Sequence, residues 1–109
     1  MAYDEELGDR VRAHVEQESG LSEKRMFGGL AFLINGHMAV AASTDGLMVR
    51  IDPADTAEFL REPHARPMEM RGRELNGWLR LEVDVRVSDE ELAPWIRRGI
   101  AYARSLPPK

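Results

Sequence analysis

Two cations and two glycines lie close together in the first third of the chain, and they form its best candidate for a binding site. The four residues are Lys24, Arg25, Gly28 and Gly29. Backbone amides of glycine-rich segments can form a concave nest for an anion, and neighbouring cations strengthen such a site. The alternative is architectural, because a glycine pair within a strand often marks a β-bulge. The lysine precedes the glycines, so the segment does not match a P-loop.

The histidines do not predict a metal site. His14, His37 and His64 share no helical spacing and belong to three different predicted elements. A transition-metal site needs several imidazole, thiolate or carboxylate ligands that converge on one point. The chain has no cysteine, which excludes thiolate ligands, Cys nucleophiles and disulfides. We therefore expect no metal and no cofactor.

No group of residues in the sequence predicts a reaction. Ser43, Ser88 and Ser105 lie outside any nucleophile-elbow motif. Asp89 and Glu90 lie at the expected start of a helix, where carboxylates complement the helix dipole. Paired catalytic carboxylates instead need buried surroundings that separate their pKa values. We expect no catalytic residues and a protein that is not an enzyme.

Met48 is the candidate interface residue. It lies in a predicted strand, opposite the apolar face formed by Leu47, Val49 and Ile51. Methionine side chains suit adaptable interfaces, because they are flexible and polarizable. If Met48 is exposed beside other apolar groups, a homodimer formed through the sheet is expected. The predicted partner is therefore another protein or a second copy of the chain.

The composition is that of an ordinary globular domain, which we expect to span residues 1–109. Hydrophobic residues make up 43% and charged residues 31% of the chain. The net charge of -4 argues against general nucleic-acid binding, which depends on clustered Lys and Arg. The acidic N-terminus is unlike a signal peptide, and no apolar run approaches the roughly 20 residues that span a bilayer. We expect a cytoplasmic protein with no membrane contact.

Hydrophobic periodicity predicts three helices and five strands. Ser88 begins a capping box with Glu91, which marks the start of the last helix. In chain order the predicted elements are a helix (3–19), three strands (24–34, 37–41 and 47–51), a short helix (52–60), two strands (68–70 and 78–85) and a final helix (88–106). The tight turns between strands predict a mostly antiparallel five-stranded sheet. The expected fold class is therefore two-layer α+β, in the order α-β-β-β-α-β-β-α.

Asn35 and Gly36 predict a two-residue hairpin turn, because both tolerate a positive φ and lie between apolar runs. The run 30–34 is apolar on both faces, which predicts a strand covered on both sides, or covered on one side by a partner chain. The expected cross-strand pairs are Ile34 with His37, Leu33 with Met38, Phe32 with Ala39 and Leu30 with Ala41.

Over nearly its whole length, the sequence resembles the TfoX N-terminal domain family. The resemblance depends on a combination of segments, none of which is specific alone. They are Lys24-Arg25-Met26-Phe27-Gly28-Gly29 with the apolar residues that follow, Asn35-Gly36-His37-Met38, and residues 3–7, 47–50, 65–68, 77–78 and 103–109. The resemblance implies the same element order, with helices packed on an antiparallel sheet.

The TfoX/Sxy members of this family regulate natural competence in bacteria and carry a second, C-terminal domain related to helix-hairpin-helix folds. This sequence ends at Lys109, so we do not extend a competence role or direct DNA binding to it. The resemblance supplies no catalytic residues. It implies a small regulatory or interaction domain that is not catalytic. The alternative is a domain that binds an anion or a small metabolite through residues 24–29.

Overall fold

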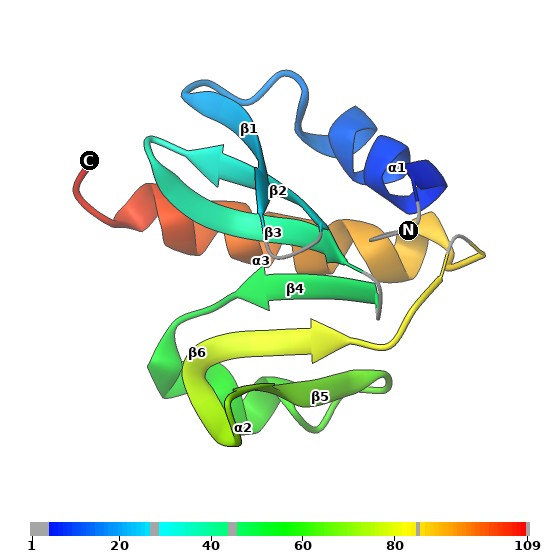
Figure 1. Ribbon diagram of the computed structural model, residues 1–109, viewed down its shortest axis with the longest axis vertical. Coiled ribbons are helices and arrows are strands. Elements are labelled where there is room, and N and C mark those ends of the chain that lie inside the picture. The colour runs from blue at the N-terminus through cyan, green and yellow to red at the C-terminus, as the bar shows by residue number, and fades with distance from the viewer. Residues whose placement is uncertain (1–4, 27–28, 44–45, 85, 109) are drawn as a thin grey trace.

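The computed structural model describes residues 5–26, 29–43, 46–84 and 86–108 (Figure 1). The helices and strands follow one another in the order expected from the sequence, with one additional strand near the N-terminus. The elements are α1 (Glu5–Val15), β1 (Leu21–Met26), β2 (Gly29–Ile34), β3 (His37–Ser43), β4 (Gly46–Arg50), a 3₁₀ turn (Pro53–Asp55), α2 (Thr56–Phe59), β5 (Ala65–Met70), β6 (Arg73–Leu81) and α3 (Asp89–Ser105). The fold class is α+β, as predicted.

Within the described ranges, six strands form one antiparallel sheet in the order β1-β2-β3-β4-β6-β5. The prediction of five strands was wrong, because the segment ending at Met26 is a separate strand. It pairs antiparallel with β2, with Met26 opposite Gly29, so the predicted bulge within a single strand is also wrong. The sequence of β1 is mostly polar, as suits an edge strand, and it therefore lacks the apolar pattern that identifies a central strand.

The hairpin between β2 and β3 has the predicted turn, with φ of 53° at Asn35 and 87° at Gly36. The pairs next to the turn, Ile34 with His37 and Leu33 with Met38, are confirmed. Beyond them the register shifts by one residue. The observed pairs are Phe32 with Val40 and Leu30 with Ala42, so the expected pairing of Phe32 with Ala39 and of Leu30 with Ala41 was wrong.

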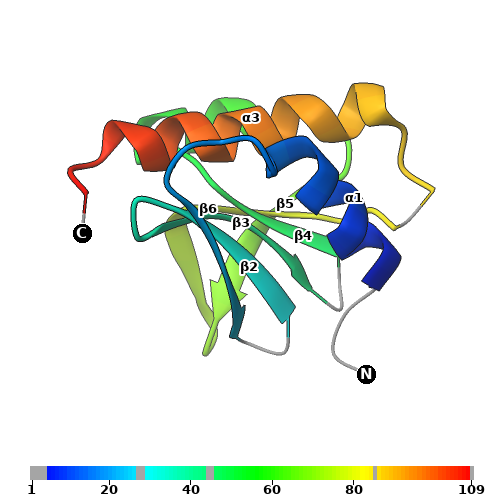
Figure 2. The ribbon, with the colours of Figure 1, turned by 90° about the horizontal axis from the view of Figure 1, so that it is seen from above.

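All three described helices lie on one face of the sheet (Figure 2). The stripe predicted for the last helix is buried, and Leu92, Trp95, Ile96, Ile100 and Ala103 are each at most 7% exposed. Helix α1 adds Leu7, Val11 and Val15, and the inward residues of β2, β3, β4 and β6 complete the main core. None of the helices in the described ranges is long and apolar enough to cross a membrane.

Element boundaries differ from the prediction at several ends. Helix α1 ends at Val15, four residues before the predicted end, and β6 covers Arg73–Leu81 instead of residues 78–85. The start of α3 is confirmed, because the Ser88 hydroxyl accepts a hydrogen bond from the Glu91 amide at 3.2 Å.

Candidate interaction surface

Strand β4 has apolar side chains on both faces of the sheet. Successive residues of a strand point to opposite faces. Leu47 and Val49 face the helices and are fully buried in the main core. Met48 points to the opposite face, which none of the described helices covers (Figure 2). The sheet therefore separates two apolar clusters, and only one of them lies under helices.

We call the second group the outer cluster. Its base is formed by Ala31, Ala41 and Met48, which are 0%, 4% and 6% exposed. Ala41 lies directly opposite both Ala31 and Met48 in the strand register. Four larger side chains, each partly buried, pack around this base: Leu33, Met38, Met68 and Trp78. The outer cluster therefore extends from β2 across the sheet to β5, with small residues near its middle.

An apolar cluster of this kind is unusual on a sheet face that no described helix covers. Antiparallel sheets that face water usually carry polar residues on that side. Contiguous exposed apolar groups in a folded protein mark sites of interaction. The outer cluster is thus the feature of the described structure that is best explained by a partner.

Basic side chains border the outer cluster. Residues directly opposite one another in an antiparallel pair share a face. Lys24 lies opposite Ala31, while Arg80 lies opposite both Met48 and Arg66, so all three cations belong to the outer face. The Glu82 carboxylate lies 3.3 Å from Arg66 and 3.4 Å from Arg80. Glu69 lines a shallow hollow together with Arg66, Met68 and Arg80, so this border carries carboxylates as well as cations.

Arg50 adds a cation at one end of the outer cluster. It lies opposite Trp78 in the register, and its guanidinium carbon is 5.6 Å from the centroid of the Trp78 ring. The same atom is 5.6 Å from the ring of Tyr102 in α3. Both distances allow a cation–π attraction. Arg50 therefore holds Trp78 in place and keeps a positive charge beside it.

Met48 occupies the face predicted for it, beside other apolar groups. With 6% exposure it forms the base of the outer cluster and offers little contact area itself. The side chains that offer area are Leu33, Met38, Met68 and Trp78, none of which was selected from the sequence. The run 30–34, which is apolar on both faces, was the signal in the sequence that pointed to Leu33.

The two cations of the predicted anion site lie on opposite faces of the sheet. Lys24 lies opposite Ala31 on the outer face, whereas Arg25 lies opposite Leu30, which belongs to the main core. Gly28 lies outside the described residues. Packing explains the glycine at position 29, because a Cβ there would lie 2.2 Å from the carbonyl oxygen of Ala42. The anion site stays a prediction, and its two cations would approach a ligand from different faces.

The histidines lie in three separate places. His14 Nε2 is 3.4 Å from the Asp89 carboxylate, and His37 Nε2 is 2.6 Å from the carbonyl oxygen of Pro107. His64 Nε2 is 3.7 Å from the carboxylate of Glu91. Across the described ranges, no group of three or more His, Asp or Glu residues is placed to hold a metal ion.

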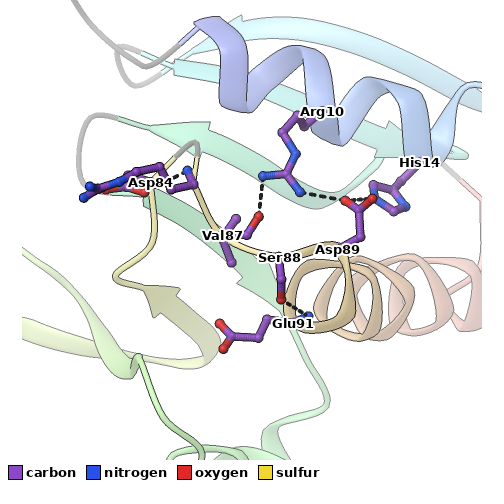
Figure 3. A network of polar contacts seen from close by, with 8 residues as sticks. Arg10, His14, Asp84, Val87, Ser88, Asp89 and Glu91 are labelled. Carbon is purple, nitrogen blue, oxygen red and sulfur yellow. Dashed lines mark hydrogen bonds and ion pairs between the residues drawn. The ribbon is translucent and has the colours of Figure 1, made fainter.

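A polar network fixes α1 against the start of α3 (Figure 3). Arg10 donates to the carbonyl oxygen of Val87 and to the Asp89 carboxylate, the latter at 2.6 Å. Hydrogen bonds from Arg10, and then from His14, lower the pKa of Asp89 below its usual value. A second pair joins α1 to β1, because the Arg12 guanidinium donates two hydrogen bonds to Glu23 and lowers its pKa. These contacts hold the helices on one face and leave the other face open.

The sequence was compared with models of protein families. Residues 13–103 match the family described as TfoX N-terminal domain. A search of curated proteins found no significant match. The matched range includes every residue of the outer cluster.

Proposed function

This chain belongs to the TfoX N-terminal domain family, and we propose that it is a non-catalytic regulatory domain that binds another protein through the outer cluster. The observation that carries the proposal is the apolar group around Met48 on a sheet face that the described helices leave uncovered. The proposal keeps the cytoplasmic location expected from the sequence.

The composition of the outer cluster suits protein binding. Met38, Met48 and Met68 lie within it, and methionines adapt their shape to an opposing surface. Trp78 contributes a large ring of the type enriched among interface residues that dominate affinity. The contact would therefore be apolar at its centre.

The charged border favours a partner with acidic groups around its apolar residues. The cations at this border are Lys24, Arg50, Arg66 and Arg80, and they outnumber the carboxylates of Glu69 and Glu82. A second copy docked face to face would bring like charges together, which costs affinity. We therefore favour a different protein over a homodimer.

Nucleic acid is a weaker candidate for the same face. Arg66 and Arg80 are already partly neutralised by Glu82, so they offer less attraction to phosphates. Arg50 lies by the ring of Trp78, where a base would have to stack. The chain also carries a net charge of -4.

Site-specific photo-crosslinking in cells tests the proposal. A photoreactive residue replaces Met68 in the outer cluster, and a matched variant carries it at Ala101, an exposed position of α3. We expect a discrete protein adduct from the first position and none from the second. The captured partner, once purified, should bind the wild-type chain and bind Leu33→Asp at least tenfold more weakly.

Three results would contradict the proposal. Equal adducts from both positions would show that capture is not specific to the sheet face. Adducts with nucleic acid alone would assign the face to a different ligand. A dimer formed by the purified chain, and abolished by Leu33→Asp, would show that the second copy occupies the surface. Circular dichroism establishes that each variant is folded.

A further inference from the structure

A cavity of about 230 Å³ lies on the helical side of the sheet, away from the outer cluster. It is enclosed by the turn before β5, the segment that follows β6, and the first turns of α3. Its lining includes Leu81, Leu92 and Trp95, which are 2%, 1% and 5% exposed and belong to the main core. Val83 and Val87 add apolar side chains to the wall. The inside of the cavity is thus apolar.

The lining also contains two prolines and several charged groups, among which carboxylates outnumber cations. Glu62, Glu90 and Glu91 face one guanidinium, that of Arg98. His64 is the other titratable group in the lining. We call this feature the acidic cavity.

The charge of Arg98 is already balanced by contacts within the protein. Its two terminal nitrogens lie 3.2 Å and 3.0 Å from the two oxygens of Glu62. Its guanidinium carbon is 4.3 Å from the centroid of the Phe59 ring and 4.4 Å from that of Trp95. Such bidentate and stacked geometry is characteristic of a fixed arginine. The Glu62–Arg98 pair therefore adds no net charge to the lining of the cavity.

The groups left to recognise a ligand are Glu90, Glu91 and His64. The 3.7 Å between His64 Nε2 and Glu91 is longer than a normal hydrogen bond, so the Glu91 carboxylate keeps capacity for another donor. The start of α3 contributes about half a positive charge from its dipole, and the carboxylates of its first turn exceed this. Asp89, the third of these carboxylates, is bound by Arg10 (Figure 3). The mouth of the cavity is therefore net negative.

The backbone at His64 is strained in a way that shapes this mouth. Its φ of 70° lies in the left-handed region, which non-glycine residues rarely adopt. Its carbonyl oxygen accepts a hydrogen bond from the Glu82 amide at 2.9 Å, which holds this conformation next to β6. Strained residues of this kind occur at ligand-binding sites.

We propose that the acidic cavity binds a small organic cation, a primary ammonium or guanidinium group on a short alkyl chain. The alkyl chain would pack against Leu92 and Trp95, and the cation would lie between the carboxylates of Glu90 and Glu91. The volume is below the range of pockets for drug-sized ligands, which suits one side-chain-sized group. This site is independent of the outer cluster, because it lies on the other face of the sheet.

A ligand series of matched length tests the proposal by NMR. Pentylammonium, 1-pentanol and pentanoate are each titrated into the protein while the indole N–H signal of Trp95 is followed. The indole signal of Trp78, which lies in the outer cluster, is an internal control. We expect pentylammonium to shift Trp95 alone and to bind at least about threefold more tightly than pentanol. Equal binding of pentanol, tighter binding of pentanoate, or no shift at Trp95 would overturn the proposal.

Variants assign the charge contribution. Glu90→Gln and Glu91→Gln should each weaken pentylammonium binding about threefold. Glu16→Gln removes a carboxylate from an exposed position after α1 and should leave binding unchanged. Equal weakening by all three variants would contradict a local site and indicate a general effect of net charge. Each substituted residue is exposed, so each variant should fold normally. The dispersion of the NMR spectrum checks this.

A further titration distinguishes the two possible sources of the cation, a lysine side chain of a protein and a small amine. An acetylated lysine amide, whose only cation is its side-chain ammonium, is titrated beside pentylammonium. Comparable binding of the lysine amide assigns the cavity to a lysine side chain of a protein chain. Binding of pentylammonium alone excludes a peptide backbone and assigns the cavity to a small amine.

Discussion

Leu47 and Met48 are neighbours in β4, and truncating each to alanine should have different costs in stability. Leu47 is fully buried between the sheet and the helices. Met48 is almost as buried, at 6% exposure, but it lies in the outer cluster, on the face that the described helices leave uncovered. The two residues thus compare the core under the helices with the cluster on the face that the described helices leave uncovered.

The expected costs follow from what fills the space left behind. Leu47→Ala leaves a cavity enclosed on all sides, and such changes lower the free energy of unfolding by about 3 kcal/mol. At Met48 the flexible outer side chains can collapse and water can enter, so the cavity penalty largely disappears. Met48→Ala should then cost about 1.5 kcal/mol, mostly from lost burial.

Urea unfolding of the isolated protein measures this difference. With a slope of about 1.5 kcal/mol per molar urea, the midpoint should fall by about 2 M for Leu47→Ala and by about 1 M for Met48→Ala. An unchanged slope for both variants is the control that the denatured state is the same. Equal losses would refute the reasoning, because they would show that the outer cluster is enclosed as tightly as the main core.

Two further predictions concern the way α3 is held on the sheet. Gly99→Val should lower the unfolding free energy by about 2 kcal/mol or more, since a Cβ there would lie 2.5 Å from the carbonyl oxygen of Ala39. Ala101→Val, on the exposed side of α3, should cost under about 1 kcal/mol in the same urea experiment, and equal losses would contradict close packing at Gly99. Asp89→Asn should make stability less dependent on pH below about pH 4, the range in which an unfolded aspartate takes up its proton. Because Arg10 and His14 lower the pKa of Asp89, its contribution is present above the unfolded pKa and is lost as pH falls through the folded one. Thermal unfolding from pH 2 to pH 7 measures this, and parallel curves for variant and wild type would contradict it.

The parts of the fold that were predicted correctly depend on strong local signals. These parts are the turn at Asn35-Gly36, the cap at Ser88 and the buried stripe of α3. Each depends on residues that lie close together in the sequence. The register shift in β3 left no such signal. Residues 39–42 are all apolar and three of them are alanine, so they fit either face of the sheet, and an extra residue does not disturb the pattern.

The sequence predicted the apolar character of the uncovered face but not its position relative to the helices. The sequence shows that residues 30–34 are apolar on both sides, which raised the possibility of a partner. It does not show which face the helices take, because that depends on the packing of α1 and α3 by distant pairs such as Arg10 with Asp89. The acidic cavity was not predicted either. His64 and Glu91 are far apart in the chain, and they come together only where the turn before β5 meets the start of α3.

Methyl NMR of the methionines is the most direct test of the proposed function. Met38, Met48 and Met68 all lie in the outer cluster, so selectively labelled methionine methyl groups report on this face. When the partner identified by crosslinking is added, we predict that these three signals shift or broaden. The methyl signals of Val11 and Ile100, which lie in the main core under the helices, should change little. Unchanged methionine signals, with changes confined to the helical side, would contradict the assignment of this face as the binding surface.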